Sequence, residues 1–157
     1  MSTVIQIAPV RKSIHVKASP QHAFEIFTAG IDRWWPKTHN IVDSPVRRTA
    51  MEPSAGGRWY TIAEDGTEVT VGRILVWEPG QRLVCSWDVT AEWKPESRPE
   101  FSSEFEIRFK AVDGGTLVEL EHRNFERMGA RNGETARAGL DGGWPGVLQL
   151  FAAAVDA

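Results

Sequence analysis

The period-two alternation in residues 101–112, FSSEFEIRFKAV, constrains the fold more than any other feature of the sequence. Successive side chains of a β-strand point to opposite faces, so this pattern predicts a strand with one apolar and one charged face. The apolar face must be covered by a second layer, while Glu106 and Arg108 should be exposed to solvent. The covered face would consist of Phe101, Ser103, Phe105, Ile107 and Phe109.

Similar alternation recurs along the chain and predicts an antiparallel sheet of about six to seven strands. Asp65-Gly66 is typical of a tight turn between two of them. In the first strand, Ile14 and Val16 should face the core. The inward residues of the last strand should be Val118, Leu120 and His122. The expected strands cover residues 10–19, 45–53, 57–66, 67–80, 82–89, 101–112 and 116–125.

Helical spacing appears on either side of the later strands. Ser19 can cap a helix whose first turn accepts Pro20, and a short second helical turn should end at Pro36. A C-terminal helix is expected over residues 141–155, or from near Glu134 with a kink at Pro145. Its apolar stripe would consist of Trp144, Val147, Leu148, Phe151 and Val155.

These elements define an α+β fold in which one long helix must cover a curved sheet. A single helix cannot cover a sheet of this size completely, so the uncovered part should become a cavity. With 157 residues, 41% of them hydrophobic, the chain is long enough for one domain with its own core.

Composition excludes several classes of partner. A net charge of −3 argues against nucleic acid, which requires clustered Lys and Arg, and no apolar stretch is long enough for a membrane helix. The single cysteine, Cys85, cannot form an internal disulfide and lies in a strand-like segment. The first ten residues lack the pattern of a secretion signal, so a cytoplasmic protein is expected.

Five segments in this order resemble the bacterial branch of the START/SRPBCC superfamily. More narrowly, they resemble the proteins named after the activator of the heat-shock chaperone ATPase, in their C-terminal-domain form. The segments are SPQHAFEIFT…IDRWWP, EPSAGGRWY, GRILVWEPGQRLVCSW, GGTLVELEHRNFERMG and the GGW near the C-terminus. The resemblance implies one helix-grip (START/Bet v-like) domain over residues 1–157, with a pocket between sheet and C-terminal helix. The resemblance does not imply one particular function, because lipid carriers, cyclases, receptors and co-chaperone domains all have this fold.

Trp34 and Trp35 raise a question of placement. Adjacent residues on a helix point about 100° apart, so the two rings cannot share one face. In the layout that the resemblance implies, their helical turn closes the mouth between the sheet and the C-terminal helix. One ring could then face the pocket while the other packs on the sheet, without the sequence deciding which. Alternatively, both rings serve only as packing.

His122 and Glu52 are the candidate catalytic residues. An inward histidine at the end of a strand can move protons near neutral pH, although it can equally be a buried histidine that bonds a backbone carbonyl. Glu52 could bring a carboxylate to the pocket rim with Arg58 or Arg73 as its partner, or be a solvated strand end. The other histidines, expected on the surface, are His15, His22 and His39. No residue spacing fits a metal site, a phosphate loop or a nucleophile elbow, so neither metal nor cofactor is expected.

Three functions remain open at this stage. The first is a binder of one small apolar ligand, aromatic or acyl, and the second is a cyclase-like enzyme with His122 as acid and base. The third, a module that binds a chaperone, is the least favoured, because the eukaryotic activators use a second domain for which this chain is too short. Sheet edges in this fold often pair, which would give a homodimer. The expected pocket residues are Trp34, Trp35, Trp59, Trp87, Phe105, Phe109, His122 and Trp144.

Overall fold

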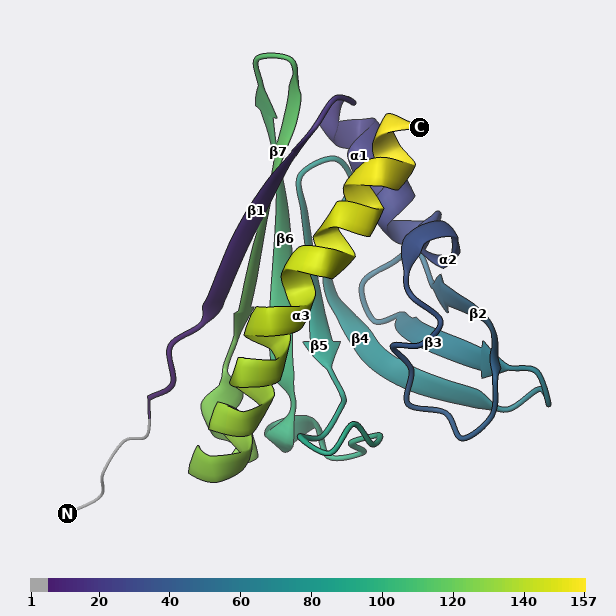
Figure 1. Ribbon diagram of the computed structural model, residues 1–157, viewed down its shortest axis with the longest axis vertical. Helices are drawn as coiled ribbons and strands as arrows, with labels where there is room; N and C mark the ends of the chain where they lie inside the picture. Colours follow the sequence, from purple (N-terminus) through teal and green to yellow (C-terminus); the bar gives the residue numbers. More distant parts are fainter. Residues whose placement is uncertain (1–5) are drawn as a thin grey trace.

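The computed structural model describes residues 6–157, which form a curved antiparallel sheet with a long helix across one face (Figure 1). The strands are β1 (Val10–Val16), β2 (Val46–Met51), β3 (Arg58–Ala63), β4 (Glu68–Glu78), β5 (Arg82–Trp87), β6 (Ser103–Val112) and β7 (Gly115–Arg123). The helices are α1 (Pro20–Thr28), α2 (Ile31–Trp34) and α3 (Ala130–Asp156), with short 3-10 turns η1 (Pro99–Phe101) and η2 (Phe125–Met128). The sheet has the order β1-β7-β6-β5-β4-β3-β2, which confirms the helix-grip fold class.

Strand alternation sets which side chains reach the core. In β7 every second residue is buried, and in β6 Phe105, Ile107 and Phe109 are buried as the pattern predicts. β6 pairs with β7 so that Phe105 lies opposite His122, which brings the inward faces of the two strands together. Phe101 differs from the prediction, because the chain turns in η1 before β6 begins, and the residue is 41% exposed.

Glu106 also differs from the prediction, being only 5% exposed. The strand register is nevertheless correct, since the apolar neighbours of Glu106 face the core. Arginines on the outer face of the sheet cover the carboxylate: Arg108 Nε lies 2.8 Å and Arg82 Nε 3.4 Å from Glu106 Oε2, and Arg123 donates to Oε1. Alternation predicts the face of a residue, but not the coverage that long charged neighbours give it.

The first helical segments follow their sequence signals. Ser19 caps α1 by accepting a hydrogen bond from the backbone N–H of His22 at 3.2 Å, and Pro20 occupies the first turn. The apolar stripe of α1, including Phe24 and Phe27, is buried against β6 and α3. The short helix α2 follows and ends at Trp34, just before Pro36, as expected.

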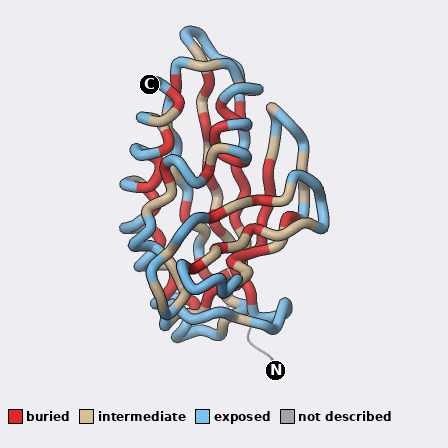
Figure 2. The backbone as a smooth tube through the Cα atoms, turned by 90° about the vertical axis from the view of Figure 1, so that its right-hand side faces the viewer, coloured by how far each residue is buried: buried red, intermediate tan, exposed pale blue. Residues whose placement is uncertain are grey.

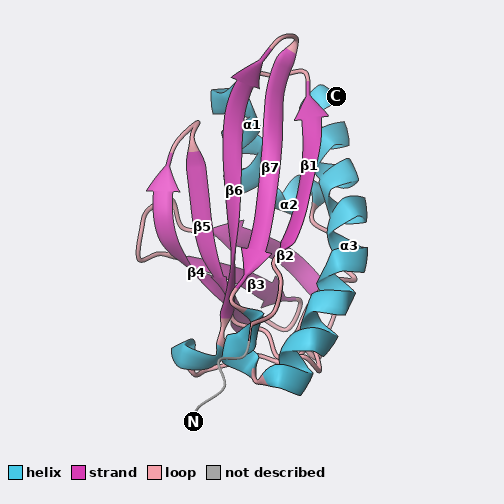
Figure 3. Cartoon of the chain, turned by 90° about the vertical axis from the view of Figure 1, so that its left-hand side faces the viewer, coloured by secondary structure: helices cyan, strands magenta, loops and turns pink. Residues whose placement is uncertain are grey.

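α3 is longer than the expected segment and begins at Ala130. Its glycines lower helix propensity and hide this start in the sequence. One of them, Gly133, allows close packing, because a Cβ there would lie 2.4 Å from the Phe125 carbonyl oxygen. Pro145 lies inside the helix, and the predicted apolar stripe from Trp144 onward is buried. Figure 2 shows buried residues on the inner side of α3, and Figure 3 shows the helix and sheet as two layers.

No helix among the described residues combines the length and the apolar character needed to cross a membrane.

Candidate functional site

A cavity of about 400 Å³ lies between α3, the loop after α2 and the loop after β5. This volume falls within the usual range for small-molecule sites. Most of its lining is apolar, with polar side chains on one segment at residues 38–40. The lining residues are Trp35, Thr38, His39, Asn40, Ile41, Val71, Trp87, Val89, Trp93, Gly139, Leu140, Gly143, Trp144 and Val147.

Four tryptophans, Trp35, Trp87, Trp93 and Trp144, form the aromatic part of the cavity wall. The ring of Trp87 is central: its centroid lies 6.5 Å from Trp35, 6.5 Å from Trp93 and 6.3 Å from Trp144. Trp87 and Trp93 stand perpendicular to each other. Edge-to-face contacts of this kind hold the rings at fixed orientations and leave flat apolar surfaces toward the cavity.

The helix side of the cavity is open because two glycines lie there, one turn apart. A Cβ on Gly143 would meet no atom within 4 Å, and a Cβ on Gly139 would only touch the Trp93 ring at 3.5 Å. Helix interiors disfavour glycine by about 1 kcal/mol relative to alanine. Here the missing side chains leave space beside Trp144, so the cavity extends to the α3 backbone.

Trp34 and Trp35 take different roles. The buried ring of Trp34 packs 5.0 Å from Phe27 and 5.2 Å from Phe151, and its indole N–H donates to the Ile26 carbonyl at 2.8 Å. Trp35 is half-buried, lines the cavity, and donates to the His39 carbonyl at 3.1 Å. One ring therefore belongs to the core and the other to the cavity.

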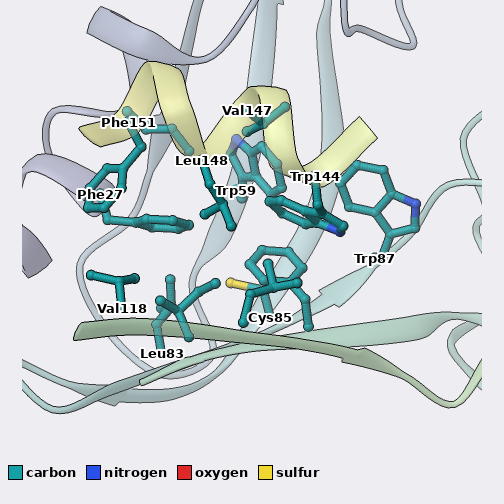
Figure 4. Packing of buried hydrophobic residues seen from close by; sticks show 14 of the residues in the cluster. Phe27, Trp59, Leu83, Cys85, Trp87, Val118, Trp144, Val147, Leu148 and Phe151 are labelled. Carbon is teal, nitrogen blue, oxygen red and sulfur yellow. The ribbon is translucent and has the colours of Figure 1, made fainter. Parts of the chain in front are cut away.

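Of the eight expected pocket residues, Trp35, Trp87 and Trp144 line the cavity. The structure places the other five in the buried core, away from the cavity lining. Trp59, one of the buried core residues labelled in Figure 4, packs edge-on against Trp35 at 4.8 Å and donates to Thr49 Oγ1. The remaining four are also buried in the core. One of them lies on α2, and the three that lie on β6 and β7 are covered by rings of the wall and of α1. The four residues are Trp34, Phe105, Phe109 and His122.

Sequence reasoning missed Trp93, which lies in the loop after β5. Its backbone has φ 62°, a left-handed value that is uncommon for a residue with a side chain, and the residue is 50% exposed. A large aromatic residue within the polar segment TAEWKPES was the available signal. His39 was expected to be a surface residue; it is exposed, but it also borders the cavity.

His122 lies behind Trp144 and has both ring nitrogens paired. The Trp144 indole N–H donates to Nδ1 at 3.1 Å, so Nδ1 carries no proton. The proton of the neutral ring is then on Nε2, which lies 2.8 Å from Ser103 Oγ and donates to it. The ring also stacks on Phe125, with centroids 4.8 Å apart. His122 thus anchors a cavity wall through Trp144 and does not itself reach the cavity.

Complete burial, with a smaller contribution from the positive charge of Arg123, lowers the pKa of His122 to about 3. The unfolded chain holds this histidine at its ordinary pKa near 6.5. Between these values the unfolded state binds one more proton than the folded state, so His122 makes the protein less stable as pH falls from 6.5 toward 3.

We expect wild-type protein to lose about 2–3 kcal/mol more unfolding free energy than His122→Gln between pH 7.5 and pH 4.5. Glutamine can accept from Trp144 and donate to Ser103 but does not titrate. Urea denaturation at the two pH values measures the difference, and carboxylates such as Glu121 contribute equally to both proteins. His15→Gln, at an exposed site, should behave as wild type does. Equal losses in wild type and His122→Gln would contradict a buried neutral His122.

Glu52 is tied to β3 and does not line the cavity. Its carboxylate accepts from the backbone N–H of Arg58 at 2.7 Å and lies 3.5 Å from the Arg58 guanidinium. The backbone hydrogen bond first, and then the guanidinium, hold the pKa of Glu52 below its ordinary value. These contacts are those of a solvated strand end, the alternative reading of the sequence.

No group of three or more potential metal-ligating side chains occurs within residues 6–157. Cys85 is buried in the sheet, and this burial raises the pKa of its thiol. A thiol in that state is a packing group and a poor nucleophile.

Comparison with known proteins identifies the family. Residues 17–156 match the family model described as Activator of Hsp90 ATPase homolog 1-like protein. A search of curated proteins found no match.

Several solved structures resemble this one over most of their length. An anthrahydroquino-gamma-pyrone synthase shares 41% identity, covering 94% of this chain and 97% of its own, with a TM-score of 0.64. The self-sacrificing resistance protein CalC from Micromonospora echinospora shares 35% identity over 94% of each chain, with a TM-score of 0.68. The Aha1 dimer from Colwellia psychrerythraea, 16% identical over 96% of this chain and 97% of its own, shares the fold with a TM-score of 0.67.

Proposed function

The chain belongs to the Activator of Hsp90 ATPase homolog 1-like family, and we propose that it uses its cavity to bind one flat aromatic ligand. The observation that carries this proposal is the apolar cavity of about 400 Å³ walled by four tryptophans. Flat rings stack favourably on indole faces, and each buried apolar contact adds to affinity. The 41%-identical neighbour, described as an anthrahydroquino-gamma-pyrone synthase, supports a ligand of this class.

The geometry gives less support to the two alternatives. An acid–base role for His122 would need a ring nitrogen in contact with the ligand, whereas both nitrogens are bonded to Trp144 and Ser103. A protein-binding module would use an outer surface and would leave the open space beside Gly139 and Gly143 unexplained. A ligand that fills the cavity explains both the tryptophan wall and the glycines.

A titration with 9-fluorenone, a flat three-ring ketone, tests the proposal. We expect the indole N–H signals of Trp35, Trp87, Trp93 and Trp144 to shift in ¹H–¹⁵N NMR spectra and to saturate with one ligand per chain. Trp77 is the internal reference, because it packs 5.0 Å from Phe24 and does not line the cavity. Unchanged spectra, or an equal shift of Trp77, would contradict binding in the cavity.

A further inference from the structure

The indole N–H groups of the buried tryptophans differ in one respect. Buried Trp34, Trp59 and Trp144, and half-buried Trp35, each donate to a protein acceptor, at distances between 2.8 and 3.1 Å. Within residues 6–157, the N–H of Trp87 has no acceptor, although the residue is only 6% exposed. Buried tryptophans usually pair this group, so an unpaired one needs an explanation.

The Trp87 nitrogen is not sealed inside the protein. Among the described residues, the fully enclosed side-chain nitrogen and oxygen atoms that make no hydrogen bond are Arg82 Nε and Glu106 Oε2, which form an ion pair with each other. Trp87 Nε1 is absent from this set, so it is not fully enclosed, and Trp87 lines the cavity. Figure 4 shows the nitrogen on the side of the ring that faces away from Cys85 and Trp59.

We infer that Trp87 determines ligand specificity by donating its indole N–H to an oxygen of the bound aromatic compound. This inference rests on the proposed binding function and narrows it. The ligand class is a flat aromatic compound with a carbonyl or phenolic oxygen on its edge, because such an oxygen accepts a hydrogen bond in the plane of the rings. A purely hydrocarbon ligand would leave the buried N–H unpaired and would lose affinity for that reason.

Two further features agree with an oxygen-bearing ligand. The surrounding wall is apolar, so a bound ligand that excludes water leaves the Trp87 N–H no other acceptor, and the site then discriminates between ligands with and without one. The other polar groups of the lining, Thr38, His39 and Asn40, lie together on the loop after α2. The residues that α3 contributes to the wall are Gly139, Leu140, Gly143, Trp144 and Val147. Only Trp144 among them has a polar side-chain atom, and that N–H already donates to His122.

The test compares 9-fluorenone with fluorene, which has the same three fused rings and a CH₂ group in place of the carbonyl. Dissociation constants for both probes are measured by NMR titration in wild type, Trp87→Phe and Trp35→Phe. Trp87→Phe keeps an aromatic ring but removes the free donor. Trp35→Phe is the matched control: it also shrinks a wall ring, but its N–H is already bonded to the His39 carbonyl.

We expect Trp87→Phe to move the affinity ratio of the two probes about three- to tenfold in favour of fluorene, the value of one net hydrogen bond. Trp35→Phe should weaken both probes while their ratio stays within about twofold. An unchanged ratio in Trp87→Phe would overturn the inference and leave the proposed binding function standing. Failure of both probes to bind wild type would overturn the binding function as well.

If Trp87→Phe does not fold, NMR spectra of the wild-type protein test the inference instead. The Trp87 indole N–H proton should move downfield when 9-fluorenone binds, as expected for a new hydrogen bond, and should not do so with fluorene. The same response to both probes would rule out donation to the ligand oxygen.

Discussion

Phe151→Ala should lower the free energy of unfolding by about 3–5 kcal/mol, the usual cost of truncating a buried phenylalanine. Phe151 is fully buried on α3, where its ring lies 5.2 Å from Phe27 and 5.2 Å from Trp34. These contacts connect α3 to α1 and α2, so the truncation leaves a cavity at the point where the three helices meet. Urea denaturation at neutral pH measures the loss.

Leu150→Ala is the matched control, because Leu150 is the preceding residue of the same helix and is 47% exposed. Exposed substitutions of this kind usually change stability by less than about 0.5 kcal/mol. A loss below about 1 kcal/mol for Phe151→Ala would show that α3 does not pack on α1 and α2 through Phe151.

The fold was largely predictable because its signals are periodic. Alternation in residues 101–112 and helical spacing from Trp144 onward predicted β6 and the second half of α3. The start of α3 was not predictable in this way, since Gly133 weakens helix propensity and is accommodated through tertiary contact with Phe125. Glu106 was placed on the correct face, yet three arginines from β5, β6 and β7 cover it.

The cavity was only partly predictable. Alternation indicates that a side chain points inward, but inward residues either line a cavity or lie behind those that do. His122 and Phe105 point inward as predicted and are nevertheless covered by Trp144 and Trp87. Whether an inward residue lines the cavity depends on the path of α3 and of the loops after α2 and after β5. Trp93 reaches the cavity through a left-handed backbone conformation, which no periodic sequence pattern encodes.

Gly143→Phe tests most directly whether the cavity beneath α3 is the binding site. Gly143 lines the cavity and a Cβ there would meet no atom within 4 Å, so we expect a phenylalanine at this position to occupy volume that the ligand needs. We expect the affinity for 9-fluorenone to fall at least about 100-fold, which corresponds to about 2.7 kcal/mol. Thermal stability should not fall, because phenylalanine has a higher helix propensity than glycine.

Gly142→Phe provides the control for this measurement. Gly142 is the adjacent exposed position of the same helix; a Cβ there also meets nothing within 4 Å, but the residue does not line the cavity. Calorimetric titration of both folded variants with 9-fluorenone should show binding close to that of wild type for Gly142→Phe and loss of binding for Gly143→Phe. Binding by Gly143→Phe within about threefold of wild type would contradict a ligand site in this cavity.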